Sequence, residues 1–421
     1  MIRQMKDSGI EWIGKIPSHW KITKCKYISK FINGFAFDSK DFVSEYQYPI
    51  IRIGDITNGS IDFKNCLGVN DNEGLDDYRI QENDILLAMS GATVGKVGLS
   101  TNKCNAYINQ RVGIIRSNVF KYLFYNLQTS KFIEYILLQA SGSAQPNVSG
   151  TVYGEFTIPF PPFPEQEAIS DFLDKQCSEI DSVIERTKAT IEEYKKLKQS
   201  IITEAVTKGI RGDRPMKDSG IEWIGDIPAR WDIKVAFQLF SQVKNKNEGL
   251  VEQNLLSLSY GKIKRKSIDA VGGLLPENFD GYNIIEKDDI VLRLTDLQND
   301  HTSLRVGLSN ERGIVTSAYV TLRNQSDNTP LYLYYYLHSF DLCKGFYGMG
   351  AGVRQGLNWE GLKLLKIALP PIDEQKEITD FLEKKCAEID ALVTKKEQIV
   401  VELEAYKKSL IYEVVTGKRS V

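Results

Sequence analysis

The chain has 421 residues, of which 42% are hydrophobic and 26% are charged, and its formal net charge is −2. This length allows roughly two to four domains with cores of their own, and the near-neutral charge excludes a general electrostatic attraction to nucleic acid or membranes. The six cysteines include no CxxC pair, so we expect neither a zinc site nor a disulfide framework. Because no apolar stretch reaches the length of a membrane span and no signal peptide begins the chain, we expect a soluble cytoplasmic protein.

The dominant feature of the sequence is an internal duplication. The segment MKDSGIEWIGKIPSHW at 5–20 returns as MKDSGIEWIGDIPARW at 216–231. A second segment, PPFPEQEAISDFLDKQCSEID at 161–181, returns as PPIDEQKEITDFLEKKCAEID at 370–390. The two matches recur at nearly the same distance along the chain, and the stretches between them agree more loosely. This pattern predicts a duplicated domain pair and not a solenoid of short repeats.

The duplication divides the chain into six segments. Proline-rich sequence ends each globular stretch, and a long run without Pro or internal Gly follows it, as expected of a helix. The expected segments are an opening segment at 1–20, a globular domain at 21–160, a long helix at 161–210, a linker with the repeated opening motif at 211–231, a second globular domain at 232–369 and a second long helix at 370–421.

Both globular stretches combine short strand-like runs with turn signals. In the first domain we expect strands at 49–56, 85–91, 96–100 and 111–117 and a helix at 121–140. In the second we expect strands at 255–261, 289–295, 305–309 and 318–324 and a helix at 330–340. Each domain is therefore predicted to be α+β, with a twisted and partly closed sheet.

The two Pro-free runs carry a seven-residue apolar repeat, which predicts an antiparallel coiled coil. The expected seam residues are Ile169, Leu173, Ile180, Val183, Tyr194, Leu197 and Ile201 in the first helix, and Ile378, Leu382, Ile389, Leu392, Ile399, Leu403, Tyr406 and Leu410 in the second. About 43 residues would make a helix of roughly 64 Å. Head-to-tail pairing would relate the domains by a pseudo-two-fold axis and make the helices a spacer between them.

Polar residues interrupt the predicted seam at Gln176, Thr187, Thr190, Lys385 and Lys396. Such residues can fix the register and the partner of a coiled coil. They can equally mark the edges of a looser helix pair, and the sequence leaves both interpretations open.

The motifs of common enzymes are missing from the sequence. The stretch GATVGKVG at 91–98 has one residue too few, and no Ser or Thr after the Lys, for a phosphate-binding P-loop. No GxGxxG follows a strand, no HExxH is present, and the proline pairs lack the Asn or Asp that precedes them in amino-methyltransferases. Acidic pairs such as Asp288-Asp289 fit turns. We therefore predict no catalytic residue and no metal site.

The loops of both domains are rich in side chains that suit DNA. Arg and Lys match guanine edges, Asn and Gln match adenine, and Lys, Arg, Ser and Thr bind phosphates. The candidates in the first domain are Arg52, Ser90, Thr93, Lys96, Asn109, Gln110, Arg111, Gln145 and Asn147. Those in the second are Lys262, Lys264, Arg265, Lys266, Arg293, Thr295, Gln298, Asn299, Arg305, Arg354, Gln355 and Asn358. Ordinary solvated loops would have a similar composition, so this alternative stays open.

Taken together, these motifs resemble the specificity subunit of type I restriction–modification systems. The resemblance rests on KDSGIEWIG with its following IP and W, SGATVGKVGL with the later NQR, GSAQPNVSG, GMGAGVRQGLNWEGLK, and the repeated PP..EQ, DFL and ID signature. It covers essentially the whole chain in both halves.

The resemblance implies a function. Each globular domain would be a target recognition domain that reads one half of a bipartite, asymmetric site in double-stranded DNA. Two methyltransferase subunits would dock on the chain and bring S-adenosylmethionine for adenine methylation. Two restriction-translocation subunits would bring ATP and Mg²⁺ for translocation and cleavage. The chain itself would be non-catalytic and hold no cofactor.

Two other functions remain as alternatives. A coiled-coil scaffold that binds only proteins would assemble a complex that ignores DNA sequence. A self-contained nuclease or methyltransferase would show activity as the isolated chain.

Overall fold

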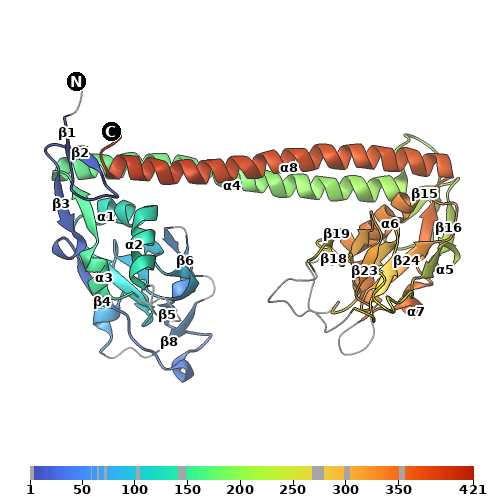
Figure 1. The fold of residues 1–421 in the computed structure, drawn as a ribbon, viewed down its shortest axis with the longest axis horizontal. Coiled ribbons are helices and arrows are strands. Elements are labelled where there is room, and N and C mark those ends of the chain that lie inside the picture. Colours follow the sequence, from blue (N-terminus) through green and yellow to red (C-terminus); the bar gives the residue numbers. More distant parts are fainter. Residues whose placement is uncertain are drawn as a thin grey trace. The chain divides into compact units, whose positions relative to one another are not determined.

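The computed structural model describes residues 4–57, 59–63, 66–70, 74–100, 105–140, 148–267, 279–297, 304–349 and 356–421. The chain forms two compact units (Figure 1). The first comprises Met1–Lys188 with Gln398–Val421, and the second comprises Ala189–Glu397. Each unit therefore holds one globular domain together with parts of both long helices.

The first unit contains thirteen strands and three short helices among its described residues, together with part of α4. The strands are β1 (Met5–Asp7), β2 (Lys15–Pro17), β3 (Lys21–Lys24), β4 (Lys30–Asn33), β5 (Tyr48–Ile51), β6 (Ile56–Thr57), β7 (Ser60–Ile61), β8 (Leu67–Val69), β9 (Ile85–Ala88), β10 (Val97–Leu99), β11 (Tyr107–Ile108), β12 (Val112–Arg116) and β13 (Thr157–Phe160). The helices are α1 (Phe120–Leu127), α2 (Ser130–Ala140), α3 (Gly150–Glu155) and the long α4 (Phe163–Lys208), which continues into the second unit. Its larger sheets have the strand orders β10-β9-β12-β4 and β11-β5-β8.

The second unit repeats this plan. Its strands are β14 (Met216–Asp218), β15 (Asp226–Pro228), β16 (Asp232–Val235), β17 (Phe240–Gln242), β18 (Leu256–Ser259), β19 (Lys262–Arg265), β20 (Asn283–Ile285), β21 (Ile290–Leu292), β22 (Val306–Leu308), β23 (Gly313–Val315), β24 (Val320–Asn324) and β25 (Lys366–Leu369). Its helices are α5 (Ala236–Leu239), α6 (Pro330–Leu342), α7 (Trp359–Leu362) and the long α8 (Ile372–Val415). The sheet order β22-β21-β24-β17 matches β10-β9-β12-β4 strand for strand. The α+β prediction with an internal repeat is confirmed.

The central strands are apolar on both faces because both faces are covered. All four residues of β9 are buried. Ile85 and Leu87 pack in the core that includes the helices, whereas Leu86 and Ala88 pack in a second cluster on the opposite face. The alternation of side chains along a strand explains this division.

One predicted helix is divided in two. The run expected as a single helix at 121–140 forms α1 and α2, which are separated at Gln128 and Thr129. The Thr129 hydroxyl donates to the carbonyl of Asn126 at 2.7 Å. It also accepts from the amide of Phe132. Such local bonds offer the backbone an alternative to helix continuation.

The long helices α4 and α8 pack against each other as an antiparallel pair. In the first unit Lys407 Nζ lies 2.6 Å from a carboxylate oxygen of Asp181. In the second unit Lys198 Nζ lies 2.7 Å from Asp390. The internal repeat relates Lys198 to Lys407 and Asp181 to Asp390, so the same ion pair is made twice with the helices exchanged.

The predicted seam is wrong at five positions. Val183, Leu197, Leu392, Ile399 and Tyr406 are 42–48% exposed. The buried residues stand one place later, at Cys177, Ile184 and Ile191 in α4 and at Cys386 and Val400 in α8. Because apolar residues stand at both 183 and 184, the seven-residue repeat alone could not show which of them faces the other helix. At the positions after Leu197 and Tyr406, Lys198 and Lys407 face the other helix and form ion pairs with it.

Two of the polar interruptions form bonds along their own helices. Gln176 and Lys385 occupy equivalent places in the repeat, and each bonds the glutamate three residues further along its own helix. Both are half-buried. This arrangement favours the interpretation of these residues as edge positions over a role in fixing the register.

The opening motif anchors the end of a long helix in each unit. In the first unit Trp20 is buried, and its indole donates to Glu165 of α4 at 2.9 Å. Tyr412 of α8 donates to the carbonyl of Trp12 at 2.8 Å. In the second unit Lys208 of α4 donates to the carbonyl of Asp226 at 2.8 Å. The near-identity of the two motifs thus has a structural reason.

Candidate nucleic-acid interface

Five of the candidate residues in the first domain come together at one end of its sheet. The hydroxyl of Thr93 donates to the carbonyl of Ile53, beside Arg52, at 3.2 Å. The amide of Met89 donates to the carbonyl of Arg111 at 2.9 Å. These bonds join the loops that follow β5 and β9 to the turn between β11 and β12. We call Arg52, Thr93, Asn109, Gln110 and Arg111 the loop cluster.

Two first-domain candidates, Ser90 and Lys96, do not belong to the loop cluster. Ser90 is only 8% exposed, so its hydroxyl is poorly placed to meet DNA. Lys96 is exposed and lines a cavity of about 430 Å³ whose other lining residues include Asp181, Lys188 and Glu404 of the long helices. Its neighbours are charges of both signs from α4 and α8.

Arg305 is a correction to the predicted contact set. Its side chain is 0% exposed. The guanidinium donates to the carbonyls of Arg293 at 3.0 Å and of Thr295 at 2.8 Å, and to the hydroxyl of Tyr347 at 3.2 Å. A buried guanidinium held in this way supports the loop after β21 and cannot reach a base. Thr295 on that loop is exposed, and Arg293 is half-buried.

Four further candidates of the second domain lie on one element. Strands β18 and β19 form a hairpin joined by Tyr260 and Gly261. We call residues 256–266 the basic hairpin, because Lys262, Lys264, Arg265 and Lys266 are all exposed on it. No acidic residue interrupts them.

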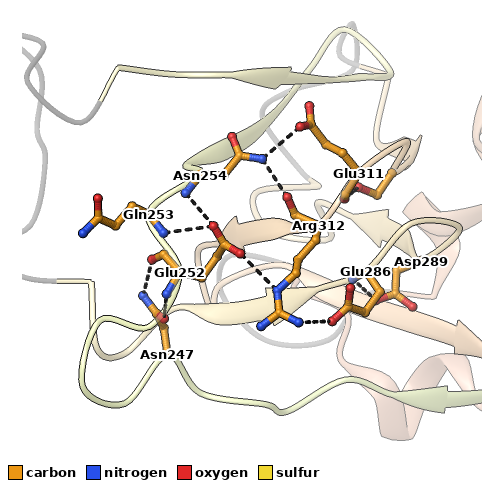
Figure 2. A network of polar contacts seen from close by, with 9 residues as sticks. Asn247, Glu252, Gln253, Asn254, Glu286, Asp289, Glu311 and Arg312 are labelled. Atoms are coloured by element: carbon orange, nitrogen blue, oxygen red, sulfur yellow. Dashed lines mark hydrogen bonds and ion pairs between the residues drawn. The ribbon is translucent and has the colours of Figure 1, made fainter.

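A polar network holds the base of the basic hairpin (Figure 2). The side-chain amide of Asn254, just before β18, donates to Glu311 at 3.0 Å. Arg265, at the end of β19, donates to the same carboxylate at 2.9 Å. Arg265 lowers the pKa of Glu311, as expected for a carboxylate beside a guanidinium. Both ends of the hairpin are therefore tied to one side chain.

The network extends to a neighbouring carboxylate (Figure 2). Glu252 accepts from the amides of Gln253 and Asn254 and from Arg312 Nε, each at 3.0 Å. The backbone bond from Asn254 is the largest cause of its lowered pKa. Sequence reasoning missed Asn254, Glu311 and Arg312 because their partners are distant in the sequence. Tyr260 was also missed, because residues 255–261 are predicted as a single strand.

Some candidates are outside the described residues or have a structural role. Gln145, Asn147, Gln298, Asn299, Arg354 and Gln355 lie outside the described residues. Asn358 caps α7 by accepting from the amide of Gly361 at 3.1 Å, which occupies its side-chain oxygen.

The acidic residues near the sheet are structural. Asp84 forms a bidentate ion pair with Arg116, with both distances at 2.8 Å. Asp289 does the same with Arg323, at 2.8 and 2.6 Å. Within the described part of the chain, no group of His, Cys, Asp and Glu could hold a metal ion. No helix in that part is long and apolar enough to cross a membrane.

Comparison with known proteins gives a consistent result. The family model "Type I restriction modification DNA specificity domain" matches residues 17–193 and 258–402. The MjaVIII specificity subunit of a type I restriction enzyme from Methanocaldococcus jannaschii is 24% identical, and the alignment covers 96% of this chain and 94% of that protein. The Escherichia coli EcoBI specificity subunit is 20% identical over 99% of this chain and 90% of its own length.

A solved structure shares the fold. A chain from a study of the assembly and conformational transition of the type I R-M system superposes with a TM-score of 0.67 at 15% identity. The match covers 96% of this chain and 99% of that one.

Proposed function

The chain belongs to the family of type I restriction–modification DNA specificity subunits, and we propose that its two globular domains read the two halves of a bipartite, asymmetric DNA site. As a specificity subunit it is non-catalytic. The observation that carries the proposal is the contrast between a repeated scaffold and divergent exposed residues. The four-stranded sheets match strand for strand, while the residues on the loops and hairpins beside them differ.

Equivalent positions show how far the two domains diverge. Lys96 and Arg305 correspond in the repeat, yet one is exposed and the other is wholly buried. Thr57 and Ser60 pair across the β6–β7 hairpin, whereas Ser259 and Lys262 pair at the corresponding place in the second domain. A common frame with unlike contact residues supports two unlike half-sites.

The partners in this proposal are two methyltransferase subunits and two restriction-translocation subunits. Exposed apolar residues on the long helices support docking of one kind of partner twice. Val183 and Leu392 are equivalent in the repeat and are 45% and 42% exposed, and Leu197 and Tyr406 are likewise equivalent at 48% and 47%. Apolar side chains repeated on helix surfaces are suited to partner helices. S-adenosylmethionine, ATP and Mg²⁺ would belong to those partners.

The long helices would set the distance between the half-sites in this proposal. Both are continuous, α4 over 46 residues and α8 over 44. Their repeated ion pairs fix one antiparallel register. Inserting one turn in each helix would therefore change the gap and leave the bases of each half-site unaltered.

A domain exchange tests the proposed function. Residues 232–369 are replaced by the matching domain of a relative, and the chain is expressed with its methyltransferase subunits. We expect the methylated motif to change in one half-site only. The matched control exchanges residues 21–160 and should change the other half-site. A motif that stays the same in both exchanges would contradict the proposal, as would a complex that ignores sequence.

A further inference from the structure

The tip of the basic hairpin exposes an aromatic ring. Tyr260 is 79% exposed, the highest value for a large hydrophobic side chain among the described residues. Its φ is 48° and that of Gly261 is 74°. Two-residue hairpin turns of this kind favour Asn or Gly at the first position, and an aromatic residue with positive φ is uncommon. Strained residues of this sort occur preferentially where function requires them.

The hairpin holds that ring on a rigid support. Leu256 and Leu258 are buried. A Cβ at Gly307 of β22 would lie 2.6 Å from Leu258 Cδ1, so the hairpin packs directly on a glycine. The base is tied to Glu311 by Asn254, just before β18, and by Arg265 of β19. The tip is therefore positioned by packing and by ion pairing.

The outer face of the hairpin has the chemistry of a phosphate contact. Ser257 pairs with Lys264, and Ser259 pairs with Lys262, which places two hydroxyls and two ammonium groups on one side. Neither lysine forms an ion pair within the described residues. Lysine and serine are common ligands of DNA phosphates, and an apolar or aromatic side chain leading such an element can press between bases.

The described residues of the corresponding hairpin in the first domain are different. Gly98 of β10 supports it as Gly307 does, because a Cβ there would lie 2.8 Å from the carbonyl oxygen of Ser60. The paired residues Thr57 and Ser60 are uncharged. The hairpin is thus a scaffold element of both domains, and its described paired residues are uncharged in the first domain but include lysines in the second.

We propose that the basic hairpin reads DNA, with Tyr260 stacking against bases of one half-site while Lys262 and Lys264 bind the flanking phosphates. This inference rests on the proposed function and assigns residues to it.

The test uses the full chain with its methyltransferase subunits and a pool of random-sequence DNA duplexes. The unsubstituted complex first selects its site from the pool, and affinity for the selected duplex is then measured over a salt series. Tyr260→Ala should bind roughly ten-fold more weakly, with the same salt dependence and weaker selection at one or two bases of a single half-site. Tyr260→Phe should bind like the unsubstituted chain, because the ring is retained.

The lysines should act differently. Replacing Lys262 and Lys264 by Ala should weaken binding to all sequences and reduce the slope of log affinity against log salt by about two. Tyr27→Ala is the matched control, since Tyr27 is 73% exposed in the first domain, and it should change nothing.

Three outcomes would overturn the inference. Tyr260→Ala with full affinity and unchanged base selection would remove the hairpin from the interface. If Tyr260→Phe binds the selected duplex as weakly as Tyr260→Ala, stacking by the ring is excluded. An unsubstituted complex that selects no sequence would contradict the proposed function, and the hairpin assignment with it.

Discussion

Arg305 offers a quantitative test of how the second domain supports its loops. Arg305→Met retains much of the side-chain volume and removes the guanidinium that bonds the carbonyls of Arg293 and Thr295 and the hydroxyl of Tyr347. Hydrogen bonds from a charged donor contribute about 1.5–3 kcal/mol each, and the new apolar contacts offset part of the loss. We expect a destabilisation of about 3 kcal/mol, which would lower the melting temperature of a unit of this size by roughly 6–12 °C.

The matched control for Arg305 is its repeat equivalent. Lys96→Met changes an exposed side chain and should leave unfolding unaltered. Scanning calorimetry would measure both melting temperatures, and hydrogen exchange would follow the amides of residues 293–297, which should exchange faster in Arg305→Met alone. Equal melting temperatures for Arg305→Met and the unsubstituted chain would refute the scaffold role.

Three further predictions concern the helices and a buried histidine. Ile184→Ala should destabilise the first unit by about 2–4 kcal/mol in urea unfolding, whereas Val183→Ala next to it should cost far less because that side chain is 45% exposed; equal losses would restore the original seam. Burial, with a smaller contribution from the charge of Lys198, lowers the pKa of His338 from 6.5 to about 4. The unfolded chain therefore binds the proton first, and stability should fall by about 3 kcal/mol as the pH drops from 6.5 to 4. His338→Gln should abolish that pH dependence, and an unchanged slope would place the titration elsewhere. Four residues inserted into each of α4 and α8 should alter the gap in the methylated motif, and an unchanged gap would contradict the spacer proposal.

The duplication made the architecture predictable. Matching segments imply matching topology, and β9 and β21 were visible as short apolar runs because central strands are buried on both faces. The turn at Tyr260 was read as the end of a strand, since a Tyr-Gly pair is a weaker hairpin signal than Asn-Gly. The structure ends β18 at Ser259.

The individual site residues were less predictable for physical reasons. An arginine at the start of a predicted strand reads as solvent-exposed, and only the folded chain shows four acceptors converging on the Arg305 side chain. The partnership of Arg265 with Glu311 joins the end of β19 to the turn between β22 and β23, which are distant in the sequence. Within the helices, Val183 and Ile184 are both apolar, so the seven-residue repeat allowed either of them to be the buried residue. Only the packing of the folded helices shows that it is Ile184.

The central claim is that this chain chooses the DNA sequence that its complex methylates. Methylome sequencing of cells that carry the methyltransferase genes, with and without this gene, tests it most directly. We predict a bipartite, asymmetric motif of methylated adenines with one fixed gap, which disappears when the gene is deleted. A motif that persists without the gene, or a methylated site without two separated halves, would contradict the account.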